Sequence, residues 1–576
     1  MSFEKKVFYS LWALMPVIYI PDFGYGYREP KIMALFLLGA VCGLRLASRT
    51  VQAPRGLLAA LGLLAVQALS YHPAVNLGLY WQSLGLTLSG VMIFLFVWQE
   101  DVDLRAMALL AVPSVLVVLV GSVAAILFKV ALVSQYAEFG STIGLKNSVS
   151  VWLALMIPFL LILVDGSRRQ DRPSGDMIRA ALFILMSVMA WVILSYRTRS
   201  AWWMLIVCVV SLACLAGRQG RRGRWARLLV FCVGAILVGV VCVKIIPGKM
   251  VWRSATPYAD SLTSLASLRY SSGRDHLWKV GLSMISRNPL RGVGGGNYAV
   301  FFRRYIPSSG ADPMRFAFMQ RDLPIFNDYL QQAVETGILG GIAFMTVAFL
   351  LPCAAWIKMS RSRETDPAVL LCGLACLAIA VDGLFDYPFL RPETLLPFCA
   401  GLGFVARRLA VRTVRLPRFL FPPLTVSLIC LCVAFFSFGF RSEMPSPRWT
   451  TFLQDTAYRL WPWDSFWDEE RLDSLLRRGD MEGAAAFVSQ RRRFWPFDPD
   501  SFLLEASLQE RQGRFGPAVD AYRHAVLEVP GGRCHASGYA QYRRFAASLP
   551  RSAQASKLSG EELGSCIVAT NLPTWR

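Results

Sequence analysis

The feature that most constrains this chain is a series of apolar blocks, each about 18 to 22 residues long, between short polar loops. A helix of that length crosses the roughly 30 Å of hydrocarbon in a bilayer and satisfies its own backbone polar groups. The composition agrees, because 55% of the 576 residues are hydrophobic and only 17% are charged. The sequence therefore predicts an all-α, polytopic transmembrane helix bundle. Typical blocks are 106–128, 151–164, 177–194, 228–246, 337–356 and 419–438.

About thirteen such spans can be drawn, and the basic residues of the short loops then gather on one side of the membrane. That side carries Lys5 and Lys6 and the stretches 45–55, 168–179, 218–227, 358–363 and 407–418. Basic loops face the cytoplasm, so we expect a cytoplasmic N-terminus and a periplasmic C-terminus. The first block, 8–20, has no small-residue cleavage site after it and is expected to be retained as a span.

The chain divides into four predicted parts. Residues 1–246 supply spans one to nine, and 247–325 form a long, polar, Arg-rich periplasmic loop. Residues 326–440 supply spans ten to thirteen, and 441–576 are soluble in character.

The C-terminal part has the spacing of tetratricopeptide helix pairs. Residues 497–530 place Gly513 at a turn and Ala518 at a helix contact, and Gly479 and Ala484 stand 34 residues earlier. Two such repeats predict a short periplasmic helical solenoid. It would bind an extended partner or pack back on the membrane part.

The formal net charge of +22 does not require a nucleic-acid partner, because most of the excess lies in the predicted cytoplasmic loops. Membrane topology and anionic lipid headgroups explain it. Of the thirteen cysteines, eleven lie in apolar spans as small hydrophobes. Cys534 and Cys566 lie in the predicted periplasmic part, where a disulfide between them is one of two open alternatives.

The long loop is rich in arginine, which binds phosphate in a bidentate manner while staying charged. Such a cluster beside the membrane favours a phosphate or pyrophosphate partner, and contact with phospholipid headgroups is the alternative. Residues 292–298, GVGGGNY, are similar in composition to a glycine-rich phosphate loop. That signal is weak on its own because no strand is predicted before it.

Several motifs together resemble the O-antigen ligase and polymerase family. They are STIGLKNSVSVWLALMIPFLL (141–161), SYRTRSAWW (195–203), SGRDHLWKVGLSMISRNPLRGVGGGNY (272–298) and FNDYLQQAVETGILGG (326–341). The segment VDGLFDYPFLRPE (381–393) resembles the branch of the family that carries tetratricopeptide repeats and polymerises exopolysaccharide.

This resemblance implies a glycosyltransferase at the outer face of the bacterial inner membrane. Its members move glycan from a polyprenyl (undecaprenyl) pyrophosphate carrier to an acceptor hydroxyl, without a nucleotide sugar, a metal or another cofactor. A polymerase is slightly favoured here by the repeats and by the 381–393 segment. For a polymerase, the resemblance implies polysaccharide export or chain-length proteins as partners of the repeats. An O-antigen ligase and a protein O-oligosaccharyltransferase stay open, because glycan, lipid and protein hydroxyls need similar chemistry.

The resemblance also implies functional residues. Arg199, Arg274 and Arg291 match basic positions of the family and are candidates for binding the pyrophosphate, whose charge grows as it leaves. Arg199 stands at the outer end of a span, where interfacial snorkelling is the alternative explanation.

A base should accept the proton of the attacking hydroxyl. The family commonly has His where this chain has Phe326, and a second common His corresponds to Asp382. The remaining candidates for the base are Glu335, Asp328, Asp386 and His276. Glu335 could instead serve helix packing. Candidates for contacts with the acceptor are Asn147, Asn327, Tyr329 and Asp382.

Other classes of protein are less favoured. A transporter or flippase of the lipid-linked glycan predicts inverted repeats and ionisable pairs at the bilayer midplane, and the sequence has no convincing repeat between its halves. A non-catalytic assembly scaffold, or an enzyme that has lost its activity, is favoured only by the missing histidine.

Overall fold

The structure is a computed structural model that describes most of the chain. The described residues are 1–20, 27–128, 141–167, 173–217, 222–246, 274–311, 324–362, 365–409, 412–439, 468–528 and 536–548. Cys534 and Cys566, the predicted disulfide partners, lie outside the described residues.

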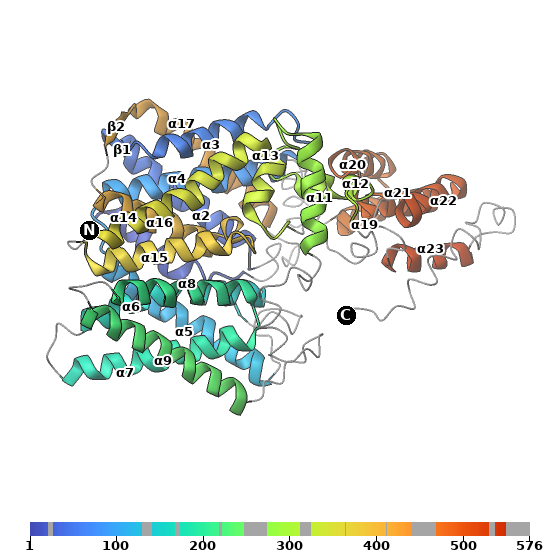
Figure 1. The fold of residues 1–576 in the computed structure, drawn as a ribbon. Coiled ribbons are helices and arrows are strands. Elements are labelled where there is room, and N and C mark those ends of the chain that lie inside the picture. The colour runs from blue at the N-terminus through green and yellow to red at the C-terminus, as the bar shows by residue number, and fades with distance from the viewer. Residues whose placement is uncertain are drawn as a thin grey trace.

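The described helices form a bundle with a smaller group of helices at one end (Figure 1). The first half of the bundle contains α1 (Phe3–Leu14), α2 (Glu29–Ala47), α3 (Leu57–Leu69), α4 (Leu77–Gln99), α5 (Leu104–Phe128), α6 (Lys146–Ser167), α7 (Pro173–Ser195), α8 (Arg199–Ala216) and α9 (Arg222–Ile245). The second half contains α13 (Asp328–Met345), η3 (Thr346–Leu350), α14 (Leu351–Arg361), α15 (Pro367–Asp382), η4 (Pro388–Leu390), α16 (Pro392–Arg408), η5 (Arg418–Leu420) and α17 (Phe421–Gly439).

Nine helices in the described ranges are long and apolar enough to cross a membrane, with α13, η3 and α14 counted as one. The shorter helices α1, α3, α15 and α16 pack among them. The predicted all-α polytopic membrane fold is thus confirmed. The predicted count of thirteen crossings, the domain boundaries and the orientation stay predictions.

The burial of the helices separates the centre of the bundle from its rim. In α6, 89% of the apolar window is buried, whereas the figure is 22% for α9 and for α17. The exposed side chains of α5 and α9 are large and apolar, for example Leu109 and Val120 or Val230 and Leu237. A surface of this kind suits lipid rather than water.

A short antiparallel sheet, which the sequence did not predict, joins two turns of the bundle. β1 (Val51–Pro54) precedes α3, and β2 (Thr413–Leu416) precedes α17. Val51 pairs with Leu416 and Pro54 with Thr413. Two of the basic stretches expected at the cytoplasmic face are therefore hydrogen-bonded to each other, and Figure 1 shows them at the end that carries the N-terminus.

We call this end the basic end, because cations there surround the buried Glu100. The Glu100 carboxylate pairs with Lys5 at 3.3 Å, Arg45 at 2.8 Å and Arg49 at 3.0 Å. Arg407 of α16 donates to the Glu100 carbonyl. Since these residues belong to, or closely follow, the helices α1, α2, α4 and α16, the cluster fixes how these helices meet.

At the opposite end, which we call the site end, lie α11 (Arg274–Arg287) and α12 (Tyr298–Tyr305). They come from the predicted long loop, which is therefore partly helical. Its segments 247–273 and 312–323 lie outside the described residues.

The C-terminal part contains paired helices beyond the site end (Figure 1). They are α19 (Asp468–Arg477), α20 (Met481–Phe494), α21 (Pro499–Arg511), α22 (Phe515–Arg523), η6 (His524–Glu528) and α23 (Ala536–Ser548). Gly479 and Gly513 form the two turns with positive φ, and Ala484 and Ala518 are fully buried. The predicted helix pairs are present, while their assignment as tetratricopeptide repeats stays a prediction.

One aromatic contact joins the C-terminal part to α12. The Phe497 ring lies 6.0 Å from the Phe301 ring, and the Arg304 guanidinium lies 5.5 Å from the centre of the Phe497 ring. The turn between α20 and α21 therefore rests on the site end of the bundle.

We expect Glu100→Gln to lower the stability of the protein by about 1 to 3 kcal/mol, because three cations lose their shared anion at a buried position. Thermal unfolding in lipid nanodiscs measures this change. Asp176→Asn is the control, since Asp176 is 78% exposed where it pairs with Arg179, and exposed pairs contribute little. Equal shifts in the two variants would contradict the assigned role of Glu100.

Candidate active site

Helix α13 is broken at Gly337. The φ angle there is +79°, and a Cβ atom would lie 2.3 Å from the Leu290 carbonyl oxygen, so only glycine fits. The Ile338 N–H donates to the Pro289 carbonyl at 2.8 Å. The chain after the break is thereby tied to the segment that follows α11.

The glycine-rich loop, residues 292–297, supplies the hydrogen bonds that the break removes. The Val293 N–H donates to the Val334 carbonyl at 3.0 Å, and the Gly294 N–H donates to the Glu335 carbonyl at 2.9 Å. Broken helices at membrane depth need such partners, because no water reaches their free carbonyl groups. The loop therefore stabilises the break.

The other N–H groups of the glycine-rich loop are also bound within the protein. The Gly292 N–H donates to the Asn288 carbonyl at 3.1 Å, and the Asn297 N–H donates to the Gly294 carbonyl at 3.0 Å. The Gly295 N–H donates to the Ser70 hydroxyl at 3.1 Å, and the Gly296 N–H donates to the Glu335 carboxylate at 2.8 Å. A phosphate loop must point free N–H groups at its ligand. The similarity to phosphate loops is therefore one of composition only.

The predicted catalytic candidate Glu335 is held by this loop. Its side chain is 1% exposed, and its two oxygens accept from the Gly296 N–H at 2.8 Å and from the Gln331 amide at 2.9 Å. Burial raises the pKa of the neighbouring Tyr298 hydroxyl, with the Glu335 carboxylate adding to the shift. This geometry favours the packing role for Glu335 over the role of a base.

The start of α13 carries backbone strain. Phe326, at the position where the family commonly has His, has a φ of +55°, which is costly for a residue with a bulky side chain. Asn327 then caps the helix by accepting from the Leu330 N–H at 2.9 Å. The cap and the strained residue together fix where α13 begins.

Asp328 and Tyr329 join α13 to its neighbours. An Asp328 carboxylate oxygen accepts from the Phe389 N–H at 3.0 Å, and the Tyr329 hydroxyl donates to the Ala380 carbonyl at 2.7 Å. Both side chains are at least 95% buried. These contacts give the two candidates, like Asn327, a structural partner within the protein.

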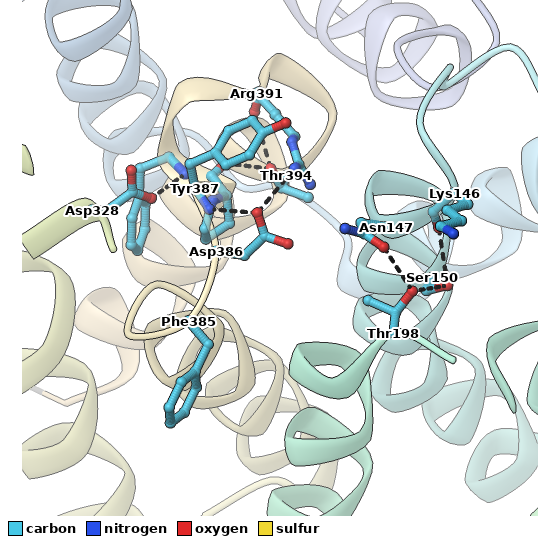
Figure 2. A network of polar contacts seen from close by, with 12 residues as sticks. Lys146, Asn147, Ser150, Thr198, Asp328, Phe385, Asp386, Tyr387, Arg391 and Thr394 are labelled. Atoms are coloured by element: carbon cyan, nitrogen blue, oxygen red, sulfur yellow. Dashed lines mark hydrogen bonds and ion pairs between the residues drawn. The ribbon is translucent and has the colours of Figure 1, made fainter. Parts of the chain in front are cut away.

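The turn between α15 and α16 brings two carboxylates together. Asp382 ends α15, Asp386 follows one helical turn later, and both are fully buried. Oδ1 of Asp386 accepts from the Tyr387 N–H at 2.9 Å and pairs with Arg391 at 3.1 Å (Figure 2). The second oxygen of Asp386 is thereby held in a fixed direction.

Four atoms of this turn have no hydrogen-bond partner in the described part of the chain. They are both carboxylate oxygens of Asp382, Oδ2 of Asp386 and Nη1 of Arg391. The Ser200 hydroxyl is close to the Asp382 carboxyl, but the pair does not meet hydrogen-bond geometry. Buried polar groups of this kind are rare and point to a functional site.

Two of the predicted candidates for binding the pyrophosphate lie beside this turn. The Arg274 guanidinium donates to the Phe385 carbonyl, and its charge acts on Asp382. Arg199 begins α8 and is near enough to Arg274 for the two charges to interact. The structure thus brings together Arg199, Arg274, Asp382 and Asp386.

The starts of α6 and α8 form a second polar group (Figure 2). The Thr198 hydroxyl lies 3.2 Å from the Asn147 amide oxygen and 3.0 Å from the Ser150 hydroxyl. Arg197, just before it, is the second strained residue, with a φ of +50°. The predicted candidate Asn147 therefore fixes the turn that carries Arg199.

The structure does not bring Arg291 and His276 into this cluster. Arg291 is exposed and follows the far end of α11, a helix about 20 Å long that begins at Arg274. His276 pairs with Asp275 at 3.6 Å. It lies two residues after Arg274, so it points to a different face of α11.

Sequence reasoning missed the buried cations Arg391 and Lys31. Arg391 is 6% exposed and pairs with Asp386, and Lys31 is fully buried and donates to the Thr142 carbonyl at 2.9 Å. Both are ionisable residues beside or within an apolar block, which is a signal for function in membrane proteins. Arg391 also belongs to the quoted 381–393 segment.

An apolar groove of about 330 Å³ runs along the bundle from the basic end toward this cluster. Its walls come from α3, α4, α13 to α14, and α16. Pro54 and Lys358 lie near one end, and Asp328 and Gln332 lie near the other. The groove suits a long hydrocarbon chain.

In the described ranges, no group of three or more His, Cys, Asp or Glu side chains is arranged to hold a metal ion.

The fold and the site define a polytopic membrane protein with buried charged groups at one end of its bundle. Residues 188–345 match the family model described as O-antigen ligase. This match supports the O-antigen ligase and polymerase family that the motifs predicted. The matched range contains Arg199 and Arg274 but ends before the turn that carries Asp382 and Asp386, which we call the acidic turn. No curated protein matches the chain.

We expect Gly296→Ala to destabilise the protein by at least about 3 kcal/mol, because its Cβ would collide with backbone as well as adopt an unfavourable φ. That Cβ would lie 2.3 Å from the Leu79 carbonyl oxygen. Gly310→Ala is the matched control, since its φ is also positive but no atom lies within 4 Å. Thermal unfolding compares the two, and equal losses would show that the close approach has no importance.

Proposed function

We propose that this protein is a membrane glycosyltransferase that moves glycan from a polyprenyl-pyrophosphate carrier to an acceptor hydroxyl. The family match supports an activity of the O-antigen ligase or polymerase type. The observation that carries the finer proposal is the acidic turn, where buried carboxylate oxygens that have no hydrogen-bond partner among the described residues lie beside Arg274.

Asp386 is the proposed base. Its Oδ1 is held by Arg391 and the Tyr387 N–H, which leaves Oδ2 to accept the proton of the acceptor hydroxyl. The hydroxyl oxygen forms a bond to the anomeric carbon as the bond from that carbon to the pyrophosphate breaks. The polyprenyl pyrophosphate departs with the electron pair. Asp382 lies one helical turn before Asp386, beside the reacting groups.

Arg274 and Arg199 are the proposed pyrophosphate clamp. Negative charge grows on the leaving group during the reaction, so fixed guanidinium groups stabilise the transition state more than the ground state. Arg274 is fixed by its bond to the Phe385 carbonyl, and Arg199 is fixed at the start of α8. Arg291 is not part of this clamp.

The apolar groove is the proposed site of the polyprenyl chain. It is bounded mainly by apolar side chains, and it leads toward Asp328, which touches the turn that carries the carboxylates. A carrier lying there would present its pyrophosphate at the site end. The proposed orientation therefore has the basic end in the cytoplasm and the site end in the periplasm of a bacterial inner membrane.

Among the possible acceptors, we favour the growing polysaccharide, which makes the protein a polymerase. The helix pairs beyond the site end contact α12 and would hold an emerging chain or an export partner. A ligase or a protein O-oligosaccharyltransferase would use the same base and clamp with another acceptor.

We expect the purified protein in nanodiscs to convert a polyprenyl-pyrophosphate oligosaccharide into a ladder of longer glycans, seen by gel electrophoresis of labelled product. A single transfer to an added acceptor would indicate a ligase instead. Donor that is carried across a vesicle membrane without chemical change would indicate a flippase and overturn the proposal.

We expect Asp386→Asn and Arg274→Ala each to lower the transfer rate by about 100-fold or more, because the base or the clamp is lost. Arg287→Ala is the matched control, since Arg287 lies at the other end of α11 and stacks on Tyr305. Rates follow from product formation over time. Unchanged turnover in Asp386→Asn would reject Asp386 as the base.

We expect Ala355→Trp, which fills part of the groove, to slow transfer from a full-length polyprenyl donor by about tenfold, while a short-chain donor is used as before. Val117→Trp on the exposed face of α5 is the control. Competition between the two donors in one assay measures the change. Equal effects on both donors would place the lipid chain elsewhere.

A further inference from the structure

Four side chains near the acidic turn stack on one another in a fixed order. The Arg274 guanidinium lies 4.6 Å from the centre of the Phe326 ring. The Phe326 ring meets the Tyr387 ring edge to face at 5.3 Å. The Arg391 guanidinium lies 3.9 Å from the centre of the Tyr387 ring. Cation and ring faces attract each other at such distances, most strongly where water is excluded.

Both ends of this stack are attached to groups that the proposed reaction uses. At one end, Arg274 is the clamp residue and also donates to the Phe385 carbonyl. At the other end, Arg391 pairs with Oδ1 of Asp386 at 3.1 Å. The stack therefore runs without interruption from the clamp to the base.

The stack also joins parts of the chain that are far apart in sequence. Arg274 begins α11, Phe326 precedes α13, and Tyr387 and Arg391 lie between α15 and α16. Phe326 is held there with a positive φ. Strain of this kind persists only where the surroundings over-determine the conformation. The contacts of the Phe326 ring are part of those surroundings.

We propose that Phe326 and Tyr387 are positioning residues that set the distance between the arginine that binds the leaving group and the carboxylate that accepts the proton. This inference rests on the proposed function. Phe326 acts through Arg274, so its ring governs binding of the pyrophosphate. Tyr387 acts through Arg391 and Asp386, so its ring governs the transfer step. The reacting groups must be held closely, because small misplacements lower rates strongly.

Binding of glycan-free polyprenyl pyrophosphate to the full chain in nanodiscs tests the first half. We expect Arg274→Ala to weaken binding by about tenfold or more and Phe326→Leu by about fivefold. In the double variant, Phe326→Leu should add less than about a twofold loss, since its effect passes through Arg274. Phe326→Tyr, which keeps the ring, should bind within about threefold of the natural protein.

Tyr387→Leu tests the second half. We expect it to bind polyprenyl pyrophosphate within about twofold of the natural protein but to transfer glycan about tenfold more slowly, because only the base is misdirected. Trp81→Leu is the control for loss of a half-exposed ring at the site end, since Trp81 contacts Tyr71 and Tyr80 instead of the stack. It should leave both measurements unchanged.

Several results would overturn the positioning role. One is an equal loss of binding from Phe326→Leu with and without Arg274, which would mean that the ring itself contacts the ligand. Another is binding by Phe326→Leu that equals that of the natural protein, or by Phe326→Tyr that is no better than by Phe326→Leu. Phe326→Met, similar in volume and more flexible, replaces Phe326→Leu if the latter does not fold.

The two proposals can fail separately. A protein that binds polyprenyl pyrophosphate as described but leaves a glycan-bearing donor intact would overturn the proposed transferase, while the binding cycle would still support the role of Phe326. A natural protein that transfers glycan but shows no coupling between Phe326 and Arg274 would overturn only the positioning role. Failure of the natural protein to bind the pyrophosphate would overturn both.

Discussion

The hydrogen bonds from the glycine-rich loop to the broken helix α13 are the interaction on which the site end depends. A break in a membrane helix exposes carbonyl groups that lipid cannot satisfy. Here the N–H groups of Val293 and Gly294 satisfy them, and the loop can approach because glycines occupy its positive-φ positions. Without this loop, α13 could not turn at Gly337, and its first half could not hold Asp328 against the acidic turn.

The same loop connects the membrane part to the C-terminal helices. It ends at Tyr298, the first residue of α12, and α12 carries the Phe301 ring that touches Phe497. The Glu335 carboxylate, which belongs to α13, accepts a hydrogen bond from the Gly296 N–H of the loop. Displacement of α12 would therefore act on α13 through few intervening contacts. The contacts of the Glu335 carboxylate with Gly296 and Gln331 therefore favour a structural role in this connection over acid–base chemistry.

Much of the fold could be predicted from the sequence, because span length and loop charge report directly on the bilayer. The helix pairs around Gly479 and Gly513 were equally readable from their spacing. The β1–β2 pairing was not, since two basic turns 362 residues apart (51 to 413) carry no local signal of contact. Nor could the sequence tell that the N–H groups of the loop at 292–297 are bound to acceptors within the protein, because some of these acceptors are exposed only by the break in α13.

The candidate site was readable by residue type but not by arrangement. Arg199, Arg274 and Arg291 were all chosen because they match basic positions of the family, and Asp382 and Asp386 because they are carboxylates near the outer ends of spans. A helix of about 20 Å separates Arg291 from Arg274. Arg391 went unnoticed, because its importance comes from the carboxylate and the ring that it contacts.

The two ends of the bundle treat buried charge in opposite ways, and this contrast locates function. At the basic end, Glu100 meets three cations, so its charge is compensated and serves to join helices. At the site end, neither oxygen of Asp382 has a hydrogen bond within the described ranges, although Arg274 and Arg391 are near. A buried carboxyl without a hydrogen-bond partner lowers the stability of the fold. A role in packing alone does not explain why the protein keeps such a group. The cost is understandable if the missing partners are the reacting groups of a substrate, since a carboxylate already bound to the protein could not accept a proton.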